Sequence, residues 1–190
     1  MSILTENLPN YLMVSGEKCP INTDFKIWLE FSNIVSKGEL DTVKIVKIFK
    51  LIFLKLPPNL VEGMKAISEF YGHASNTGAD TKEDTAEKAK KYFDFEYDAN
   101  LIYAAFFQQY KLDLTEAELH WWKFLNLFQS LSEDTKFMEV VKYRSIELSD
   151  IKDKNQKKYY AKMKKLHRLP DNRSEEQKER DLLSAFELLF

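Results

Sequence analysis

The sequence predicts an all-α fold, a bundle of about seven or eight helices with a short N-terminal β-hairpin. Apolar residues recur at spacings of three and four along most of the chain, which is the spacing of one helical face. Only five glycines and five prolines occur in 190 residues, and this scarcity favours long helices joined by short turns. With 44% hydrophobic and 14% aromatic residues, the chain can bury a core as one compact domain.

The hairpin is predicted near the N-terminus, where two short apolar runs between Tyr11 and Ile21 flank the pair Ser15-Gly16. Pro20 has no backbone N–H to donate, so the second strand should lie at a sheet edge. An isolated hairpin is only marginally stable, and we therefore expect this one to pack on the helices.

The first helix is predicted to begin after the capping run Asn22-Thr23-Asp24 and to end near Ser36, before Gly38. Its apolar spacing starts directly after the cap, which supports this boundary. The apolar face is expected to contain Phe25, Trp28, Leu29 and Val35.

The second predicted helix runs from Thr42 to Leu56, where Pro57-Pro58 ends it. Ten of the fourteen residues from 43 to 56 are apolar and the other four are lysines. A membrane span needs about 20 residues with few charges, so this segment is too short and too charged to be one. Two interpretations remain open: a core helix whose lysines reach outwards, or a helix whose apolar surface binds a partner. The partner surface would consist of Ile45, Ile48, Phe49 and Ile52.

A further helix from Asn59 to about Tyr71 is followed by a stretch without apolar periodicity, residues 72–85. We expect this stretch to be a mobile linker and the best internal boundary of the chain. Beyond it, aromatic and acidic residues alternate over 92–98, and a helix is predicted from about Ala99 to Tyr110.

The segment from Thr115 to Glu118 has the T-x-x-E form of a capping box and predicts the start of another helix. Its apolar face is expected to contain Leu119, Trp122, Leu125 and Phe128. Trp121 points about 100° away from Trp122 on such a helix, so we expect it to be half exposed and a candidate partner anchor. The turn 132–135 should lead into a helix that ends near Ser145.

The composition changes beyond residue 149, and we divide the chain into a helical core domain, 1–149, and a charged helical appendage, 150–190. Between residues 150 and 168, eight lysines and arginines stand against two aspartates. Tyr159, Met163 and Leu166 recur at helical spacing, which predicts an amphipathic helix docked by its apolar side. A partner surface and a nucleic-acid-binding helix over 152–168 remain open as alternatives. The last predicted helix follows Pro170 and carries Leu182, Leu183, Phe186, Leu189 and Phe190.

The sequence contains no recognisable pattern for catalysis or for binding a metal or cofactor. His120 has no second histidine or cysteine at ligand spacing, and the glycines occur singly rather than in a phosphate-binding loop. Asp94, Glu96 and Asp98 lack the glycine and glutamate of an EF-hand loop and are expected to stabilise a helix N-terminus. We therefore expect a protein that is not an enzyme, with no metal and no cofactor.

The single cysteine, Cys19, cannot form an internal disulfide and fits a reducing compartment. Glu6 and Pro9 interrupt the N-terminus before any apolar run develops, so no signal peptide is expected. The formal charge of −2 gives no general reason to expect binding to nucleic acid or to a membrane. We expect a soluble protein of the cytoplasm.

Five motifs occur in a fixed order between about residues 9 and 144. They are Pro20-Ile-Asn-Thr-Asp-Phe-x-x-Trp28, Phe95-Glu-Tyr-Asp-Ala-x-x-Ile-Tyr-Ala-Ala-Phe106, Gln108-Gln-Tyr-x-x-Asp-Leu114, Leu119-His-Trp-Trp-Lys-Phe124 and Thr135-x-Phe-x-x-Val-x-x-Tyr-Arg144. As an ordered set they resemble a tail-module protein family of siphophages and prophages of Gram-positive bacteria. The Leu-His-Trp-Trp run is the most diagnostic of them.

The resemblance implies a gene between those of the major tail protein and the tape-measure protein, the position typical of tail assembly chaperones. Such chaperones hold the long helical tape measure soluble until tube subunits polymerise around it. The implied partners are the tape-measure protein and a neighbouring tail-module protein, in the host cytoplasm. We expect the C-terminal residues Phe186, Leu189 and Phe190 to contact the partner. A structural component of the tail and a nucleic-acid-binding regulator using 152–168 are the alternatives.

Overall fold

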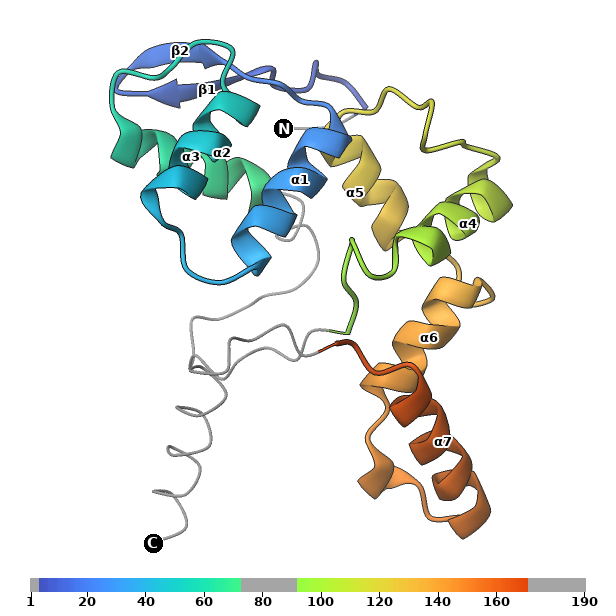
Figure 1. Ribbon diagram of the computed structural model, residues 1–190. Helices are drawn as coiled ribbons and strands as arrows, with labels where there is room; N and C mark the ends of the chain where they lie inside the picture. Colours follow the sequence, from blue (N-terminus) through green and yellow to red (C-terminus); the bar gives the residue numbers. More distant parts are fainter. Residues whose placement is uncertain (1–3, 73–91, 171–190) are drawn as a thin grey trace, which may run out of the picture.

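The computed structural model describes residues 4–72 and 92–170. Within these ranges it contains a two-stranded hairpin, seven α-helices and the short 3-10 helix η2, Leu148–Asp150 (Figure 1). The helices are α1 (Phe25–Ser36), α2 (Thr42–Ile52), α3 (Leu60–Gly72), α4 (Ala99–Tyr110), α5 (Trp121–Gln129), α6 (Lys136–Ser145) and α7 (Lys154–Leu166). This architecture confirms the predicted helical fold with an N-terminal hairpin. Most of the predicted linker and the predicted last helix lie outside the described residues.

The hairpin consists of β1 (Tyr11–Val14) and β2 (Glu17–Pro20), which pair antiparallel. Ser15 and Gly16 have φ angles of 50° and 80°, both positive as a two-residue type I′ turn requires. The backbone N–H and the hydroxyl of Ser15 both donate to a carboxylate oxygen of Glu62 at 2.8 Å. The turn is thus fastened to the first turn of α3, and the hairpin lies on the helices as predicted.

Helix α2 ends at Ile52, four residues before the predicted end at Leu56. The backbone then becomes extended, and Phe53 pairs with Ile21 just beyond β2. The carbonyl of Ile52 accepts the N–H of Asn22 at 2.8 Å. Because these backbone groups pair with the end of the hairpin, tertiary pairing ends α2 before the two prolines are reached.

Helix α5 begins at Trp121, later than the predicted capping box at 115–118 implies. Its N-cap is His120, whose Nδ1 accepts the N–H of the second helical residue at 3.1 Å. Thr115 instead donates its hydroxyl to Asp113 at 2.6 Å within the preceding loop. The capping-box prediction is therefore wrong, because the Asp113 side chain organises a local turn that uses this threonine.

A short antiparallel backbone pair joins the N-termini of α1 and α5. The N–H of Trp121 donates to the carbonyl of Thr23 at 2.8 Å, and the N–H of Phe25 donates to the carbonyl of Leu119 at 2.9 Å. The two N-cap residues, one for each helix, lie opposite each other in this pair. Two helices that are nearly a hundred residues apart in the sequence therefore start side by side (Figure 1).

Aromatic side chains from three helices stack directly behind this backbone pair. The ring centroids of Phe25 and Phe124 lie 4.8 Å apart, and those of Trp28 and Trp121 lie 6.3 Å apart. Phe124 also stacks on Phe106 of α4 at 5.3 Å. All five side chains are at most 2% exposed. These contacts form the centre of one continuous core and confirm that Phe25 and Trp28 lie on the buried face of α1.

The buried face of α1 differs in part from the prediction. Beyond Phe25 and Trp28, the buried residues are Phe31 and Ile34, whereas Val35 is 41% exposed. A spacing of three moves the buried face gradually around a helix that has 3.6 residues per turn. The face moves because α3 covers it, with the ring of Tyr71 packing edge-on against Phe31 at 5.1 Å.

Helix α7 packs on α6 through a face one residue away from the predicted one. Tyr159 and Leu166 are 51% and 66% exposed, while Tyr160 is half-buried. At the end of the helix, the His167 ring stacks on Tyr143 of α6 with centroids 5.6 Å apart. Aromatic contact with α6 therefore sets the inner face of α7. Of the predicted stripe, Tyr159 contacts Tyr143 at its edge and Met163 is partly buried, whereas the prediction is wrong for Leu166. The predicted division of the chain at residue 149 stays a prediction.

Replacing Trp122 by Ala should lower the free energy of unfolding by about 3–5 kcal/mol, as large-to-small core changes do. Trp122 is 9% exposed, and its indole N–H donates to the carbonyl of Phe70 at 2.9 Å. Equilibrium denaturation followed by far-UV circular dichroism measures the loss. The exposed neighbour Lys123, replaced by Ala, is the control and should unfold like the wild type. A Trp122→Ala variant as stable as the wild type would contradict this packing.

His120 should make the protein less stable as the pH falls below about 6.5. Burial lowers the pKa of His120, while its hydrogen bond to the Pro9 carbonyl acts in the opposite direction. The neutral ring accepts at Nδ1 from the backbone and contacts the Pro9 carbonyl through Nε2 at 3.0 Å. A protonated ring can no longer accept at Nδ1. Because the folded pKa lies below the unfolded one, the stabilisation is complete above the unfolded pKa and is lost as the pH falls through the folded pKa.

The pH dependence can be assigned to this residue with the variant His120→Asn. Asparagine is a good N-cap and does not titrate, so the variant keeps a capping acceptor at every pH. The melting temperature should therefore fall less steeply for the variant than for the wild type as the pH is lowered from about 7.5 to about 5. Parallel curves for the two proteins would show that another group causes the loss.

Candidate functional site

The residues that the sequence suggested as a partner surface on α2 lie in the core. Ile48, Phe49 and Ile52 are 0%, 2% and 0% exposed, and Ile45 is partly buried against the same core. The Phe49 ring packs so closely on α3 that a Cβ atom added at Gly63 would lie 2.9 Å from it. The core interpretation therefore holds for this face. The four residues would contact a partner only if the core opened, so they are removed from the candidate surface.

Trp121, expected to be half exposed, is 1% exposed. Its ring stacks on Trp28 and Tyr71 at 6.3 and 5.2 Å, and its indole N–H donates to the Tyr71 carbonyl at 3.4 Å. Trp121 is the first residue of α5, where α1 and α3 cover it, so it cannot serve as a surface anchor. The other three candidates, Phe186, Leu189 and Phe190, lie outside the described residues.

A different set of apolar side chains is exposed at the start of α2. Leu40, Val43 and Val46 are 39%, 77% and 46% exposed, and we call this set the α2 surface. Val43 and Val46 are three residues apart and share one helical face, opposite the buried residues. The sequence carried this signal, because the apolar positions of α2 surround the helix instead of forming one stripe.

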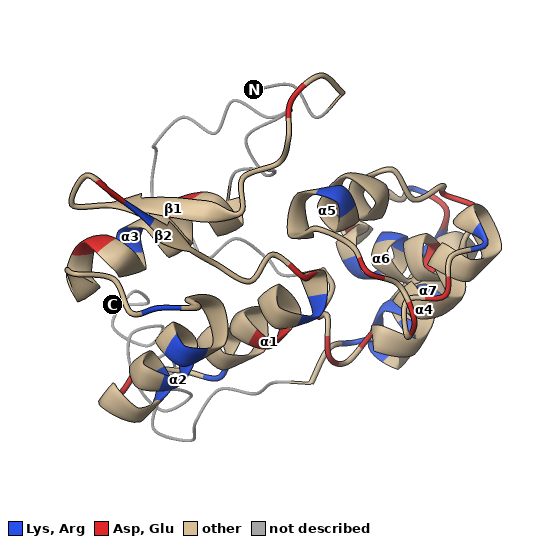
Figure 2. Cartoon of the chain, turned by 90° about the horizontal axis from the view of Figure 1, so that it is seen from above, with Lys and Arg blue, Asp and Glu red and all other residues tan. Residues whose placement is uncertain are grey.

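Lysines border the α2 surface, and two of them are held in place by neighbouring groups (Figure 2). Lys47 forms an ion pair with Glu30 of α1 at 2.8 Å. Lys44 donates to the carbonyls of Lys37 and Glu39 at 3.1 and 2.8 Å. An exposed apolar strip with basic edges suits an amphipathic helix that carries acidic residues beside its apolar face.

The connection between α2 and α3, together with the first turn of α3, exposes a second group of large apolar side chains. These are Leu54, Leu56, Leu60 and Val61, at 71%, 61%, 53% and 81% exposure. Leu54 and Leu56 would have belonged to α2 if that helix ran to Leu56 as predicted. Because α2 ends at Ile52, they lie instead on an extended segment beside the hairpin.

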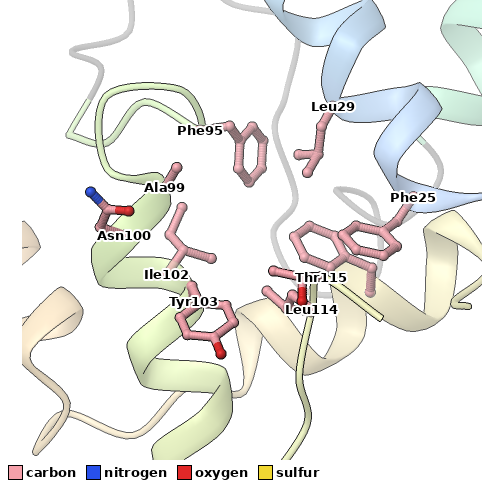
Figure 3. Close-up of a pocket in the computed structure, with 10 residues that line it drawn as sticks. Phe25, Leu29, Phe95, Ala99, Asn100, Ile102, Tyr103, Leu114 and Thr115 are labelled. Carbon is pink, nitrogen blue, oxygen red and sulfur yellow. The ribbon is translucent and has the colours of Figure 1, made fainter. Parts of the chain in front are cut away.

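A pocket of about 290 Å³ opens between α1, α4, α5 and the loop before α5 (Figure 3). It is lined by Phe25, Leu29, Phe95, Ala99, Asn100, Ile102, Tyr103, Leu114, Thr115 and Phe124. The Tyr103 hydroxyl donates to Asp113 at 3.3 Å. Desolvation first, and then the negative charge of Asp113, raise the pKa of Tyr103, so the hydroxyl remains a donor at neutral pH. The mostly apolar lining suits an apolar group rather than an ion.

A buried ion pair joins the N-terminal end of α4 to α6. The side chains of Arg144 and Asp98 are 6% and 1% exposed, and two guanidinium nitrogens donate to the two carboxylate oxygens at 2.6 and 2.8 Å. Arg144 also donates to the carbonyls of Tyr92 and His167 at 3.1 and 2.6 Å. One side chain therefore holds together α4, α6, the end of α7 and the segment before α4.

The sequence offered a signal for this pair that was missed. Arg144 follows Phe137 and Val140 by seven and four residues, so it continues the buried stripe of α6. Asp98 precedes Ile102 of α4 by four residues in the same way. A charged residue on each of two apolar stripes is a reason to expect that the two meet.

The alternating acidic residues before α4 have three separate partners. Asp98 binds Arg144, and Asp94 accepts the N–H groups of Glu96 and Tyr97 at 2.9 Å each. Glu96 forms an ion pair with Lys37 of α1 at 2.8 Å. Asp98 is the N-cap of α4 but makes no capping hydrogen bond with its side chain. In the described part of the chain, no group of three or more His, Cys, Asp or Glu residues is placed to hold a metal ion.

Helix α7 directs most of its lysines into solvent. Those at 154, 157, 158, 162 and 165 are exposed, whereas Lys164 donates to the carbonyl of Ile146 at 2.6 Å. Tyr159 and Tyr160 pack against each other and against Tyr143 of α6. Both tyrosines therefore already serve the contact with α6, and binding of a partner or of nucleic acid through 152–168 stays a prediction.

A family model described as Bacteriophage Gp15 protein matches residues 4–169 of the chain. No match was found among curated proteins or among solved structures. Of the helices in the described ranges, none is long and apolar enough to cross a membrane.

Removing one partner of the buried ion pair should be strongly destabilising. Arg144→Met leaves the Asp98 carboxylate buried without its counter-charge, and the free energy of unfolding should fall by about 3–5 kcal/mol. The double variant Asp98→Asn with Arg144→Met leaves no unpaired charge, so its loss should be smaller than the sum of the two single losses. Urea denaturation of the four proteins measures both quantities. Strictly additive losses would contradict a direct coupling of the two side chains.

Proposed function

The chain belongs to the Bacteriophage Gp15 protein family and is a bacteriophage protein, and on that premise we propose that it is a tail assembly chaperone. In this proposal it binds the phage tape-measure protein in the host cytoplasm, together with the neighbouring tail-module protein. It keeps the long helical tape measure from aggregating until tail-tube subunits polymerise around it. The activity is one of binding and requires no catalytic group.

The observation that supports this proposal is the α2 surface. Val43 is 77% exposed and Val46 is 46% exposed on a helix whose other face is fully buried. Surface apolar residues that gather on one exposed face mark sites of protein interaction more often than isolated ones do. A helical partner would place residues at i, i+3, i+4 and i+7 along such a face. The tape measure, as a long helical protein, offers this type of repeat.

The lysines beside the α2 surface restrict the kind of helix that fits. Lys50 follows Val43 and Val46 by seven and four residues, so this exposed lysine ends the same face in the last turn of α2. A partner helix with acidic residues flanking its apolar face would gain favourable charge contacts, chiefly in its rate of association and its specificity. A basic partner helix would be disfavoured by the same edge.

Charging the α2 surface should prevent the protein from binding the tape measure. In Val43→Asp with Val46→Asp, two carboxylates would lie against the apolar face of a docked helix and repel acidic residues beside it, so we expect the affinity to fall at least about tenfold. The variant is co-expressed with the tape-measure protein and the neighbouring tail-module protein. The amount of tape measure that co-purifies in a pull-down and the fraction of it that stays soluble are then measured. Both substituted positions are exposed, so the melting temperature should change little.

Two controls make this experiment specific. Leu166→Asp on α7 charges a side chain that is 66% exposed elsewhere and should leave binding unchanged. Val43→Leu with Val46→Leu keeps the surface apolar and should also bind. Wild-type binding by the charged variant would exclude the α2 surface as the contact. A tape measure that stays insoluble with wild-type protein and its neighbour would contradict the chaperone proposal, and recovery of this chain in purified particles would favour a structural role in the tail.

A further inference from the structure

The pocket between α1, α4 and α5 has an apolar interior that opens to solvent. Leu29, Phe95 and Ile102 point into the same space from α1, from the segment before α4 and from α4 itself (Figure 3). The volume of the pocket is about 290 Å³, and a cavity of about 150 Å³ is enough to hold a benzene ring. One aromatic or branched aliphatic side chain therefore fits inside it.

One edge of this pocket is polar and negatively charged. The hydroxyls of Tyr103 and Thr115, two lining residues, donate to the Asp113 carboxylate at 3.3 and 2.6 Å. The hydroxyl of Thr115 first, and then its backbone N–H, lower the pKa of Asp113, so this carboxyl is ionised at neutral pH. The pKa of Tyr103 is raised by desolvation, then by Asp113 and also by the charge of Glu116. Two carboxylates therefore act on this edge.

The negative charge of this edge is only partly balanced within the described chain. The groups that bond to Asp113 are neutral, and a carboxylate has about four lone-pair sites, so it can accept a further donor. Lys26 is the cation placed at this edge, and its ammonium donates to the Thr115 carbonyl at 2.8 Å. Among residues 4–72 and 92–170, no lysine or arginine forms an ion pair with Asp113 or Glu116. One positive charge therefore stands against two negative ones.

The other charged residues beside the pocket are already paired. Glu96, next to the lining residue Phe95, binds Lys37 at 2.8 Å. Asp98, which precedes the lining residue Ala99, is bound by Arg144. The open acceptor position at Asp113 is thus the feature that selects a partner by charge.

We propose that this pocket binds one apolar side chain of a partner protein and that a lysine or arginine of the same partner segment pairs with Asp113. An apolar group alone would cover the Asp113 edge without compensating its lost hydration, and an acidic neighbour would be repelled. A basic neighbour satisfies both requirements. Tyr103 and Thr115 hold the carboxylate in position for that contact.

The pocket thus prefers a partner of the opposite charge from the one that suits the α2 surface. Lysines border the α2 surface and favour an acidic helix, whereas Asp113 and Glu116 favour a basic segment. The protein therefore has two binding sites with different chemistry. The inference goes beyond the proposed function and does not rest on it, since the pocket is lined by residues of other helices.

Peptide titration of the isotope-labelled full-length protein tests the chemistry of this site. The probe is acetyl-Gly-Ser-Phe-Lys-Ser-Gly-amide, and the matched controls carry Glu in place of Lys or Ala in place of Phe. We expect the Phe-Lys peptide to bind at least about fivefold more tightly than either control, with amide shifts centred on Asn100 and Tyr103. Equal affinities of the Phe-Lys and Phe-Glu peptides, shifts centred elsewhere, or no shifts at millimolar peptide would overturn the proposal.

Two pairs of variants assign the binding to the pocket and to its charge. Asp113→Asn keeps an acceptor for Thr115 but removes the charge, and should weaken the Phe-Lys peptide at least about fivefold without weakening the Phe-Glu peptide. Glu133→Gln removes an exposed charge in the turn before α6 and should change nothing. Ala99→Trp fills the pocket from an exposed position and should also weaken binding, whereas Ala104→Trp, exposed on the same helix outside the pocket, should not. Full affinity in Asp113→Asn or Ala99→Trp would overturn the assignment.

Sedimentation velocity decides whether a second copy of the chain occupies the pocket instead of a separate partner. We expect the wild type, Asp113→Asn and Ala99→Trp to have the same oligomeric state, because the proposed occupant is another protein. A wild-type oligomer that dissociates in either variant would place a second copy in the pocket and overturn the proposal of a separate partner.

Discussion

The backbone pair between residues 23–25 and 119–121 is the constraint on which the rest of the structure depends. Two N–H groups at the starts of α1 and α5 bond to carbonyls of the opposite segment at 2.8 and 2.9 Å. This pairing satisfies donors that a helix N-terminus would otherwise leave free, and it fixes both helices in one register. The register brings Phe25 against Phe124 and Trp28 against Trp121, and from there the aromatic core extends to α3 and α4. His120 strengthens the pair because its ring caps α5 and contacts the Pro9 carbonyl in the segment before the hairpin.

The second half of the chain depends on a polar contact in place of an aromatic one. Arg144 satisfies the Asp98 carboxylate and two backbone carbonyls while being almost fully buried. Such a pair adds little net stability compared with an apolar contact of the same volume, because both charges lose their hydration. Its value is geometric, since a bidentate guanidinium has one preferred orientation and each of its acceptors comes from a different segment. The Arg144–Asp98 pair thereby fixes the end of α7 beside the start of α4.

These two constraints determine which apolar side chains remain available for binding. The core uses one side of α2 and both tryptophans of α5, so the residues with the strongest apolar signal in the sequence are not available. Among the described residues, the exposed apolar groups include the α2 surface and the connection between α2 and α3, and an apolar pocket opens beside α4. For a protein of a bacteriophage family, we propose that the first of these binds a partner helix.

The sequence alone determined the class of the fold, the hairpin turn and most helices, because these depend on local periodicity, caps and turn residues. Ser15-Gly16, the cap at Asp24 and the end of α4 at Tyr110 were all found in this way. The tertiary structure decided where α2 ends, where α5 begins and which faces of α1 and α7 are covered. Three of these outcomes are set by a segment distant in the chain: the end of the hairpin pairs with Phe53, α3 covers Phe31, and α7 packs on α6. The fourth, the start of α5, follows a local turn in which Asp113 accepts the hydroxyl of Thr115. The Arg144–Asp98 pair joins residues 46 positions apart, and no local pattern specifies which buried charge will meet which. The spacing of apolar residues indicates which side of a helix they share. Whether that side is buried depends on which other segment packs against it.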